Sequence, residues 1–479
     1  MRLLSASSLV PCSLLLVGLA ACNDDPPAPS EVRARITDDL GNVLHETETA
    51  MQSSSESLPG NGAFSLLGRF VSTSDTTTTT ARLRTKLARL VAPRTDVRTA
   101  ATTTTIAADG ESATDALIRK LNEELFTDAN YVGDGIYNVP PELVCMTETV
   151  ADDGTITETL DQECADNVVK AELRVRVAED GDALALAIQL DANHDEPLVF
   201  TLTHTSLAVT IDLDDANDAI AALAPVFGET APNASLAGQV TSKIEVLGAA
   251  HAKISSTIDR AIAVAFADTG VALDGPDAFR FTSAKANVFA LELDGNAKAA
   301  SAVVGIGATT AHVPGERDYD LDLPGISAVA MYSVGQPLQL TNLGLGDRTT
   351  TMSIDGQRAV AIDLNPDAGR AFGATITGDP ATGSETIAVA PKLDLHVALD
   401  HAVLQDEPPV YDVTQILLDG SLRSSDASDQ IEVLSGTFAI ATNPAQYGFS
   451  ATAGQCVSST SVQDPSGAFY DQFSVGACN

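Results

Sequence analysis

Apolar side chains recur at every second position in four runs that follow one another almost without a gap. The runs cover residues 173–177, 184–190, 198–202 and 207–213. Alternation with a period of two is the pattern of a β-strand with one apolar face. The connections are too short for parallel crossovers, which need a dozen or more residues. The four runs therefore predict consecutive antiparallel strands.

The same alternation returns along the rest of the chain. Further strands are expected around residues 240–246, 258–264, 289–293, 321–323, 360–362, 395–399, 416–418 and 438–440. Asp-Gly pairs, which suit tight turns with positive φ, begin at Asp109, Asp134, Asp153, Asp180, Asp274, Asp294, Asp355 and Asp419. The sequence thus predicts a mainly β protein, either a large antiparallel sheet or a two-layer β body built from hairpins, with a few short helices.

Two helices and one small β element are also predicted. Ser112 or Thr114 can cap a helix that runs to Phe126, and Asp214 can cap a shorter helix that ends at Pro225. Near the N-terminus, alternation of apolar and polar residues over 32–37 and an apolar patch at 64–71 suggest a small β element.

The chain divides by composition into three parts. Residues 1–21 form an apolar leader, residues 22–110 a tether and arm, and residues 111–479 a β-rich body that its length allows to contain two subdomains. Within the arm, residues 72–105 are rich in threonine and carry a basic island at 82–98. Leucines at i, i+4 and i+7 give that island one apolar helical face. It could lie on anionic lipid headgroups, dock on the acidic body or be a solvated linker helix.

The charge of the protein limits its partners. Its formal net charge is −38, with 27 Lys and Arg against 65 Asp and Glu. This balance argues against nucleic acid as a partner, because phosphate binding depends on clusters of Lys and Arg. Trp is absent and aromatic residues are 4% of the chain, which disfavours a sugar-binding surface of stacked rings.

The N-terminus carries the pattern of an export signal. Arg2 is followed by a short apolar stretch, and the run Leu19, Ala20, Ala21 and Cys22 closes it. This run resembles the lipobox of bacterial lipoproteins. The resemblance implies that residues 1–21 are removed and that Cys22 becomes the lipidated first residue.

Lipidation at Cys22 would tether the protein to a membrane, because several acyl chains give a stable anchor. The family's inner-membrane retention signal is an aspartate at mature position two, where this chain has Asn23. The resemblance therefore implies a lipid-anchored protein of the bacterial cell envelope, at the outer membrane or cell surface rather than the inner membrane.

Four cysteines remain after Cys12 and Cys22 are set aside: Cys145, Cys164, Cys456 and Cys478. An even number in an oxidising compartment predicts disulfides. Pairing Cys145 with Cys164 and Cys456 with Cys478 closes two short local loops, and two other pairings exist. A four-cysteine metal site is disfavoured, because the close Cys-x-x-Cys spacing of zinc ligands is missing.

Two triplets resemble the start of a calcium loop. They are Asp191, Asn193 and Asp195, and Asp363, Asn365 and Asp367. Both lack the glycine and the final glutamate of such a loop, so polar turn residues are the simpler interpretation. We predict no metal site and no cofactor.

The histidines give no catalytic pattern. His396 and His401 would face opposite sides of one continuous strand, and His204 continues the apolar face of Phe200 and Leu202 as a half-buried imidazole. The short motifs of zinc proteases, serine hydrolases and phosphate-binding loops are missing. We predict no catalytic residues, although a triad assembled from distant positions would escape such a search.

Several strands oppose their large aliphatic face with Ala, Thr and Ser. Such a sheet is either covered on both sides or lines a cavity. The leading hypothesis is a non-enzymatic scaffold or binding module with an unknown protein partner, recognisable by a contiguous exposed apolar patch. The alternative is a carrier of lipid or another hydrophobic ligand in a β-walled cavity. A hydrolase ranks third.

Overall fold

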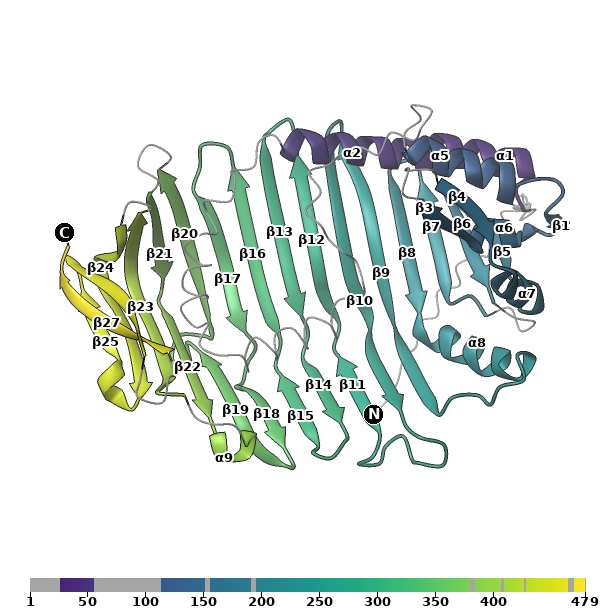
Figure 1. Ribbon diagram of the computed structural model, residues 1–479. Coiled ribbons are helices and arrows are strands. Elements are labelled where there is room, and N and C mark those ends of the chain that lie inside the picture. Colours follow the sequence, from purple (N-terminus) through teal and green to yellow (C-terminus); the bar gives the residue numbers. More distant parts are fainter. Residues whose placement is uncertain are drawn as a thin grey trace, which may run out of the picture.

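The computed structural model describes residues 26–55, 113–150, 156–190, 195–379, 384–405, 409–425, 428–463 and 469–478. Its main feature is an antiparallel sheet of 25 strands, accompanied by a separate two-stranded sheet (Figure 1). The predicted fold class is confirmed in its first form, a large antiparallel sheet with a few short helices.

The N-terminal part of the described chain is helical. Three helical segments run in direct succession: α1 (Pro29–Arg35), η1 (Ile36–Leu40) and α2 (Gly41–Ser55). The β element predicted at residues 32–37 is therefore wrong. Val32 and Ile36 fit an alternation of apolar and polar residues, but together with Leu40 they are also spaced four apart. The three residues therefore share one helical face, and all of them are buried. The companion patch at 64–71 lies outside the described residues.

The second helical part was predicted. It consists of α5 (Ala113–Lys120) and η3 (Leu121–Leu125). Together with α1 and η1 it forms the main apolar core at this end of the molecule. Tyr137 lies at the centre of this core with no exposed surface, and burial raises the pKa of its hydroxyl to about 12.

The sheet begins with six strands in chain order. They are β1 (Tyr131–Gly133), β2 (Ile136–Asn138), β5 (Arg174–Asp180), β6 (Ala183–Gln189), β7 (Leu198–Thr203) and β8 (Ser206–Asp212). The last four are the predicted strands, and each pairs antiparallel with the next. An excursion between β2 and β5 contains α6 (Pro141–Val144), β3 (Met146–Val150), β4 (Ile156–Leu160) and α7 (Gln162–Lys170).

Helix α8 (Leu213–Val226) follows β8, as predicted, but begins earlier than expected. The carboxylate of Asp212, rather than that of Asp214, accepts hydrogen bonds from the first backbone N–H groups. Pro225 lies in the last turn, just before the helix ends.

Two long strands, β9 (Ala234–Gly248) and β10 (His251–Phe266), mark the place where the sheet divides into two rows (Figure 1). The upper row contains β12 (Ala286–Asp294), β13 (Ala299–Ile306), β16 (Ile326–Ser333), β17 (Leu338–Leu345), β20 (Ala371–Asp379) and β21 (Ser384–Ala390). The lower row contains β11 (Phe279–Ser283), β14 (Thr309–Val313), β15 (Tyr319–Leu323), β18 (Thr350–Ile354), β19 (Gln357–Leu364) and β22 (Leu393–Leu399).

Each row is joined to the long strands at both ends. The first half of β10 pairs with β12 and its second half with β11. At the far end β23 (Asp412–Ser425) pairs with β21 and β22, and then with β24 (Ser428–Asn443). The two rows are therefore one meander of long strands, each interrupted near its middle.

The interruption repeats in sequence. A lower strand, two upper strands and another lower strand form a unit that occurs three times, beginning at Phe279, Tyr319 and Gln357. Each unit is a long hairpin whose two arms are broken at the same level.

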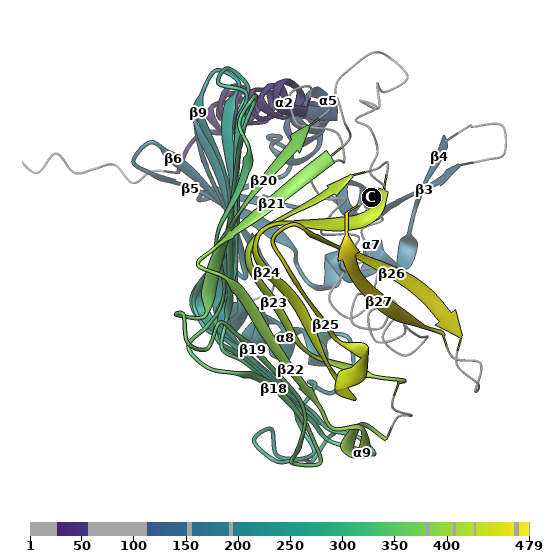
Figure 2. The same ribbon diagram turned by 90° about the vertical axis from the view of Figure 1, so that its left-hand side faces the viewer.

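The sheet bends at this level. Seen from the side, the upper and lower rows form the two arms of a V (Figure 2). Helix α2 and the C-terminal elements lie on the inner side: η4 (Ala445–Tyr447), β25 (Phe449–Thr452), β26 (Gln455–Gln463) and β27 (Phe469–Ala477). The short α9 (His401–Leu404) follows β22 at the lower edge. We call the two sides of the sheet the inner and the outer face.

Candidate binding site

The inner face is apolar in both rows. In the lower row one line of directly opposed residues crosses seven strands: Val264, Phe281, Ala311, Leu321, Met352, Val360 and Leu399. In the upper row the corresponding line is Ile254, Leu291, Ala302, Ala330, Leu340, Ala374 and Val389. Opposed residues share a face of the sheet, so each row has a continuous apolar surface.

Packing contacts show that both surfaces face the inside of the V. Ala50 of α2 packs against Ala252 and Leu293 of the upper row. At the C-terminal end Leu418 and Leu422, which flank the bend in β23, belong to one buried cluster that also contains residues of β25 and β26.

The outer face is mostly polar, although its upper row also carries Met331 and the opposed pair Val303 and Val329. One line of opposed residues in the lower row reads Arg280, His312, Asp320, Ser353 and Arg358. In the upper row the line is Lys253, Glu292, Ser301, Met331, Gln339, Thr375 and Ala388. The two faces therefore differ in chemistry across the whole width of the sheet.

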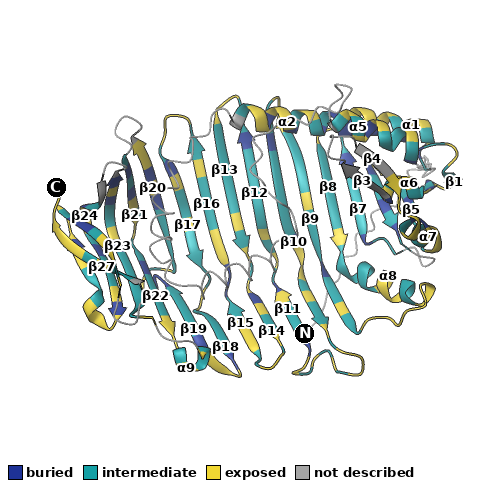
Figure 3. Ribbon diagram, in the orientation of Figure 1, coloured by how far each residue is buried: buried dark blue, intermediate teal, exposed yellow. Residues whose placement is uncertain are grey.

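Helices lie at one end of the inner face and the C-terminal strands at the other (Figure 3). Between these ends, large apolar side chains remain half-exposed. Their relative exposure lies between 37 and 46%: Phe266, Val304, Ile306, Val313, Tyr319, Leu321, Ile326 and Leu399. Exposed apolar surface of this extent is typical of a binding site. The middle of the inner face is therefore our candidate site.

Glycines mark the bend that shapes this site. Three glycines lie at the level of the bend: Gly238 in β9, Gly325 just before β16 and Gly420 in β23. Each has a backbone φ of 121° or 122°. A Cβ at Gly420 would lie 2.2 Å from the carbonyl oxygen of Ser435. Only glycine accepts both that dihedral angle and that close approach, and glycine kinks are a known means of bending a sheet.

An open depression of about 620 Å³ lies at the bend. Its lining includes Ile306 and Ile326 of the inner face, Ser327 and Ala371 of the outer face, and the bare backbone of Gly325 and Gly346. Missing Cβ atoms thus create space where the strands turn.

A polar network on the outer side of the bend fixes the loop between β19 and β20. Asn365 is fully buried; its amide nitrogen donates to the carbonyls of Ala371 (2.9 Å) and Lys392 (2.7 Å), and its side-chain oxygen accepts from the backbone N–H of Asp394 (2.6 Å). Asp363 pairs with Arg370 at 2.6 Å. Turn and bend contacts therefore explain Asp363 and Asn365 of the triplet that ends at Asp367.

Asp394 is the most enclosed charge of this network. Burial acts to raise the pKa of Asp394, but hydrogen bonds from Gln415 (2.7 Å) and Lys392 (2.8 Å) and the nearby His396 outweigh it, so the pKa is lowered from its usual value. The carboxylate therefore stabilises the fold in its charged form.

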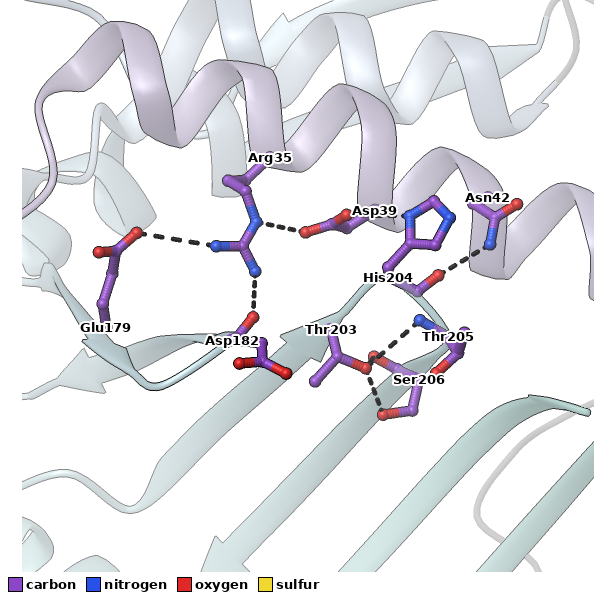
Figure 4. Close-up of polar contacts among 9 residues, drawn as sticks. All are labelled: Arg35, Asp39, Asn42, Glu179, Asp182, Thr203, His204, Thr205 and Ser206. Carbon is purple, nitrogen blue, oxygen red and sulfur yellow. Dashed lines mark hydrogen bonds and ion pairs between the residues drawn. The ribbon is translucent and has the colours of Figure 1, made fainter.

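Polar contacts hold the N-terminal helix on the tips of two hairpins (Figure 4). Arg35 donates to the carbonyl of Asp182 at 2.5 Å and lies 3.7 Å from Glu179, and Asn42 donates to the carbonyl of His204 at 2.8 Å. The helical segment lies along the upper ends of the strands as far as β12, so it covers only that part of the inner face (Figure 1).

The prediction for His204 was wrong. It lies in the turn between β7 and β8, where its side chain is 69% exposed and lies 3.2 Å from Asp39. The alternation of Phe200 and Leu202 ends where the strand ends, and the sequence contains no glycine or proline to mark that turn.

The other histidines of the described part of the chain also lie beside carboxylates. His396 contacts Asp394 at 2.9 Å, and His401, which belongs to α9 and not to the same strand, contacts Asp412 at 2.9 Å. His312 contacts Asp320 and the carbonyl of Pro276, both at 2.7 Å, and these hydrogen bonds raise its pKa.

No three His, Cys, Asp or Glu side chains in the described ranges gather closely enough to hold a metal ion.

The remaining predicted site residues are the cysteines. The structure contains both expected disulfides, Cys145 with Cys164 and Cys456 with Cys478. Cys22, the basic island at 82–98 and the triplet residues Asp191 and Asn193 lie outside the described residues. Within the described ranges, no helix is long and apolar enough to cross a membrane.

Comparison with known proteins gives no relative. No family model, no curated protein and no solved structure matches this chain.

Proposed function

We propose that this chain is an exported, lipid-anchored protein of the bacterial envelope and a non-enzymatic binding module whose inner face holds its ligand. The lipobox ending at Cys22 supports export and anchoring, and Asn23 supports the outer membrane or the cell surface. The apolar inner face of the sheet supports the binding part of the proposal.

One observation carries the binding proposal. The inner face is apolar over successive strands, and its middle part keeps large side chains such as Leu321 (38%) and Leu399 (41%) exposed. Exposed apolar surface costs free energy, about 25 cal/mol for each Å² that a ligand could cover. When a ligand covers this surface, the removal of apolar area from water favours binding by that amount.

The shape of the candidate site supports one of the two hypotheses drawn from the sequence over the other. A scaffold or binding module requires a contiguous exposed apolar patch, whereas the cavity form of a carrier requires an enclosed pocket. The middle of the inner face is the inside of an open V. An open binding surface therefore fits the geometry better than a closed β-walled cavity.

The test uses a dye that fluoresces when it binds apolar surface. The protein would be the chain from Asn23 onward, which contains every described residue. Leu321→Glu places a charge in the middle of the inner face, and Met331→Glu is its matched control, because Met331 is a similarly exposed apolar residue (41%) on the outer face. The dye signal should fall for the first variant and stay near the wild-type value for the second.

Two results would contradict the proposal: absence of dye binding to the wild-type chain, or an equal loss of signal in both variants. Thermal melting of each variant shows whether a loss reflects unfolding rather than a blocked surface.

A further inference from the structure

We propose that the lower row of the inner face holds the acyl chains of a zwitterionic phospholipid, with the head group at the lower edge of the sheet. This inference rests on the proposed function, because it names the ligand of the same surface. Three features of the lower row support it: where the apolar side chains are exposed, how long the strands are, and how the edge is charged.

Exposed apolar side chains are concentrated in the lower row. Phe266, Val313, Tyr319, Leu321 and Leu399 all lie there on the inner face, each at least 38% exposed. Tyr319 lies at the lower end of its strand, where an aromatic ring with a polar hydroxyl suits a boundary between apolar and aqueous surroundings. Its cross-strand partner Val313 lies at the same level, and Phe266 and Leu399 end their strands at this edge. The apolar surface therefore extends down to the acidic turns.

The strands of the lower row match the length of an acyl chain. β14, β15 and β18 each have five residues, which corresponds to roughly 17 Å at 3.3 to 3.4 Å per residue. Half of a bilayer's hydrocarbon core is about 15 Å thick. A chain that starts at the lower edge would therefore end near the bend.

The backbone of the lower row favours an acyl chain over a peptide. Every lower-row strand from β11 to β22 is paired on both sides, so the ladder offers no free N–H or C=O to an added strand. A peptide laid on this apolar face would leave its own backbone groups unpaired at a cost of about 1–3 kcal/mol each. An acyl chain has no such groups.

The lower edge of the sheet is strongly acidic. Its turns at residues 267–278, 314–318, 355–356 and 400–405 carry these carboxylates: Asp268, Asp274, Asp277, Glu316, Asp318, Asp355 and Asp400. Arg317 is the single Lys or Arg within these turns, and it pairs with Asp355. The upper-edge turns at 295–298 and 334–337 contain Lys298 and no acid. An amine or choline group is therefore favoured at the lower edge, and an anionic head group is repelled.

The experiment measures lipid transfer to the chain from Asn23 by native mass spectrometry. Vesicles of phosphatidylcholine and vesicles of phosphatidylglycerol serve as separate donors. Phosphatidylcholine adducts should form on the wild-type protein and on Met331→Glu, and should be about tenfold fewer on Leu321→Glu. The preference for phosphatidylcholine should shrink in high salt, because salt screens the acidic edge.

The outcomes separate this inference from the proposal on which it rests. Dye binding without any lipid adduct would overturn the lipid assignment and leave the binding surface intact, whereas loss of both would overturn both. Equal adduct formation from phosphatidylglycerol at low salt would overturn the role of the acidic edge. Equal adduct loss in both variants would place the lipid elsewhere.

Discussion

Replacing Gly420 by alanine tests whether the bend depends on glycine. Gly420 has φ of 121°, and its direct cross-strand partner is another glycine, Gly436. Holding a non-glycine residue in a sparsely populated conformation costs of order 1–3 kcal/mol. The added Cβ would also meet the Ser435 carbonyl at 2.2 Å, and relieving such overpacking costs typically 1–3 kcal/mol. We therefore expect Gly420→Ala to lower the free energy of unfolding by about 3 kcal/mol.

The assay is urea unfolding followed by circular dichroism, since the chain has no Trp to report by fluorescence. Gly378→Ala is the matched control, because Gly378 lies in strand β20 without positive φ and with nothing within 4 Å of an added Cβ. The control should change stability by less than about 0.5 kcal/mol. Equal destabilisation by the two substitutions would refute the account of the bend.

Three further predictions concern other parts of the chain. Cys22→Ser should move the protein from the membrane fraction to the soluble fraction, and retention in the membrane would contradict the lipoprotein proposal. Asp394→Asn should lower the free energy of unfolding by about 1–3 kcal/mol at neutral pH. Because the pKa of Asp394 is lowered in the folded protein, the charged carboxylate stabilises the fold above about pH 4, and this stabilisation is lost as the pH falls through the folded pKa. Acid unfolding curves of the wild type and the variant should therefore converge at low pH. Cys478→Ser removes a bridge between residues 22 apart and should lower the free energy of unfolding by about 3 kcal/mol through loop-closure entropy. The measurement is the denaturation midpoint, and reducing the wild type, which also opens the Cys145–Cys164 bridge, should lower that midpoint at least as far.

Strands with large apolar residues on one face could be predicted from sequence. The period of two over residues 173–213 gave β5 to β8 and their antiparallel pairing, and later pairs such as Leu321 with Leu323 also lie in strands. Strands made mainly of small residues were missed. β13, for example, begins with Ala299, Ala300, Ser301 and Ala302, where apolar and polar positions barely contrast.

The bend could not be predicted from sequence, because the residues at which it interrupts the strands are the types that also form hairpin turns. Asp419 with Gly420 was interpreted as a hairpin, but it lies inside β23. Asp180 with Gly181 does form the turn between two strands. The same dipeptide serves both purposes because both need a backbone with positive φ.

The apolar faces were recognised, but not the side on which they lie. Alternation shows that Leu321 and Leu323 share a face, and it does not show which face the helices cover. The helical segment at 29–55 covers one face of the sheet and so identifies the inner face. Its first residues were interpreted as a strand, because Val32 and Ile36 fit an apolar period of two as well as one of four.

The most direct test of the inner face as the binding site is photo-crosslinking. The chain from Asn23 would be irradiated with a phosphatidylcholine that carries a diazirine near the end of one acyl chain, and the modified residues would be located by mass spectrometry. We predict adducts on inner-face residues of β14, β15 and β18, including Leu321. Adducts mainly on outer-face residues such as Met331, or on β27, would contradict the account.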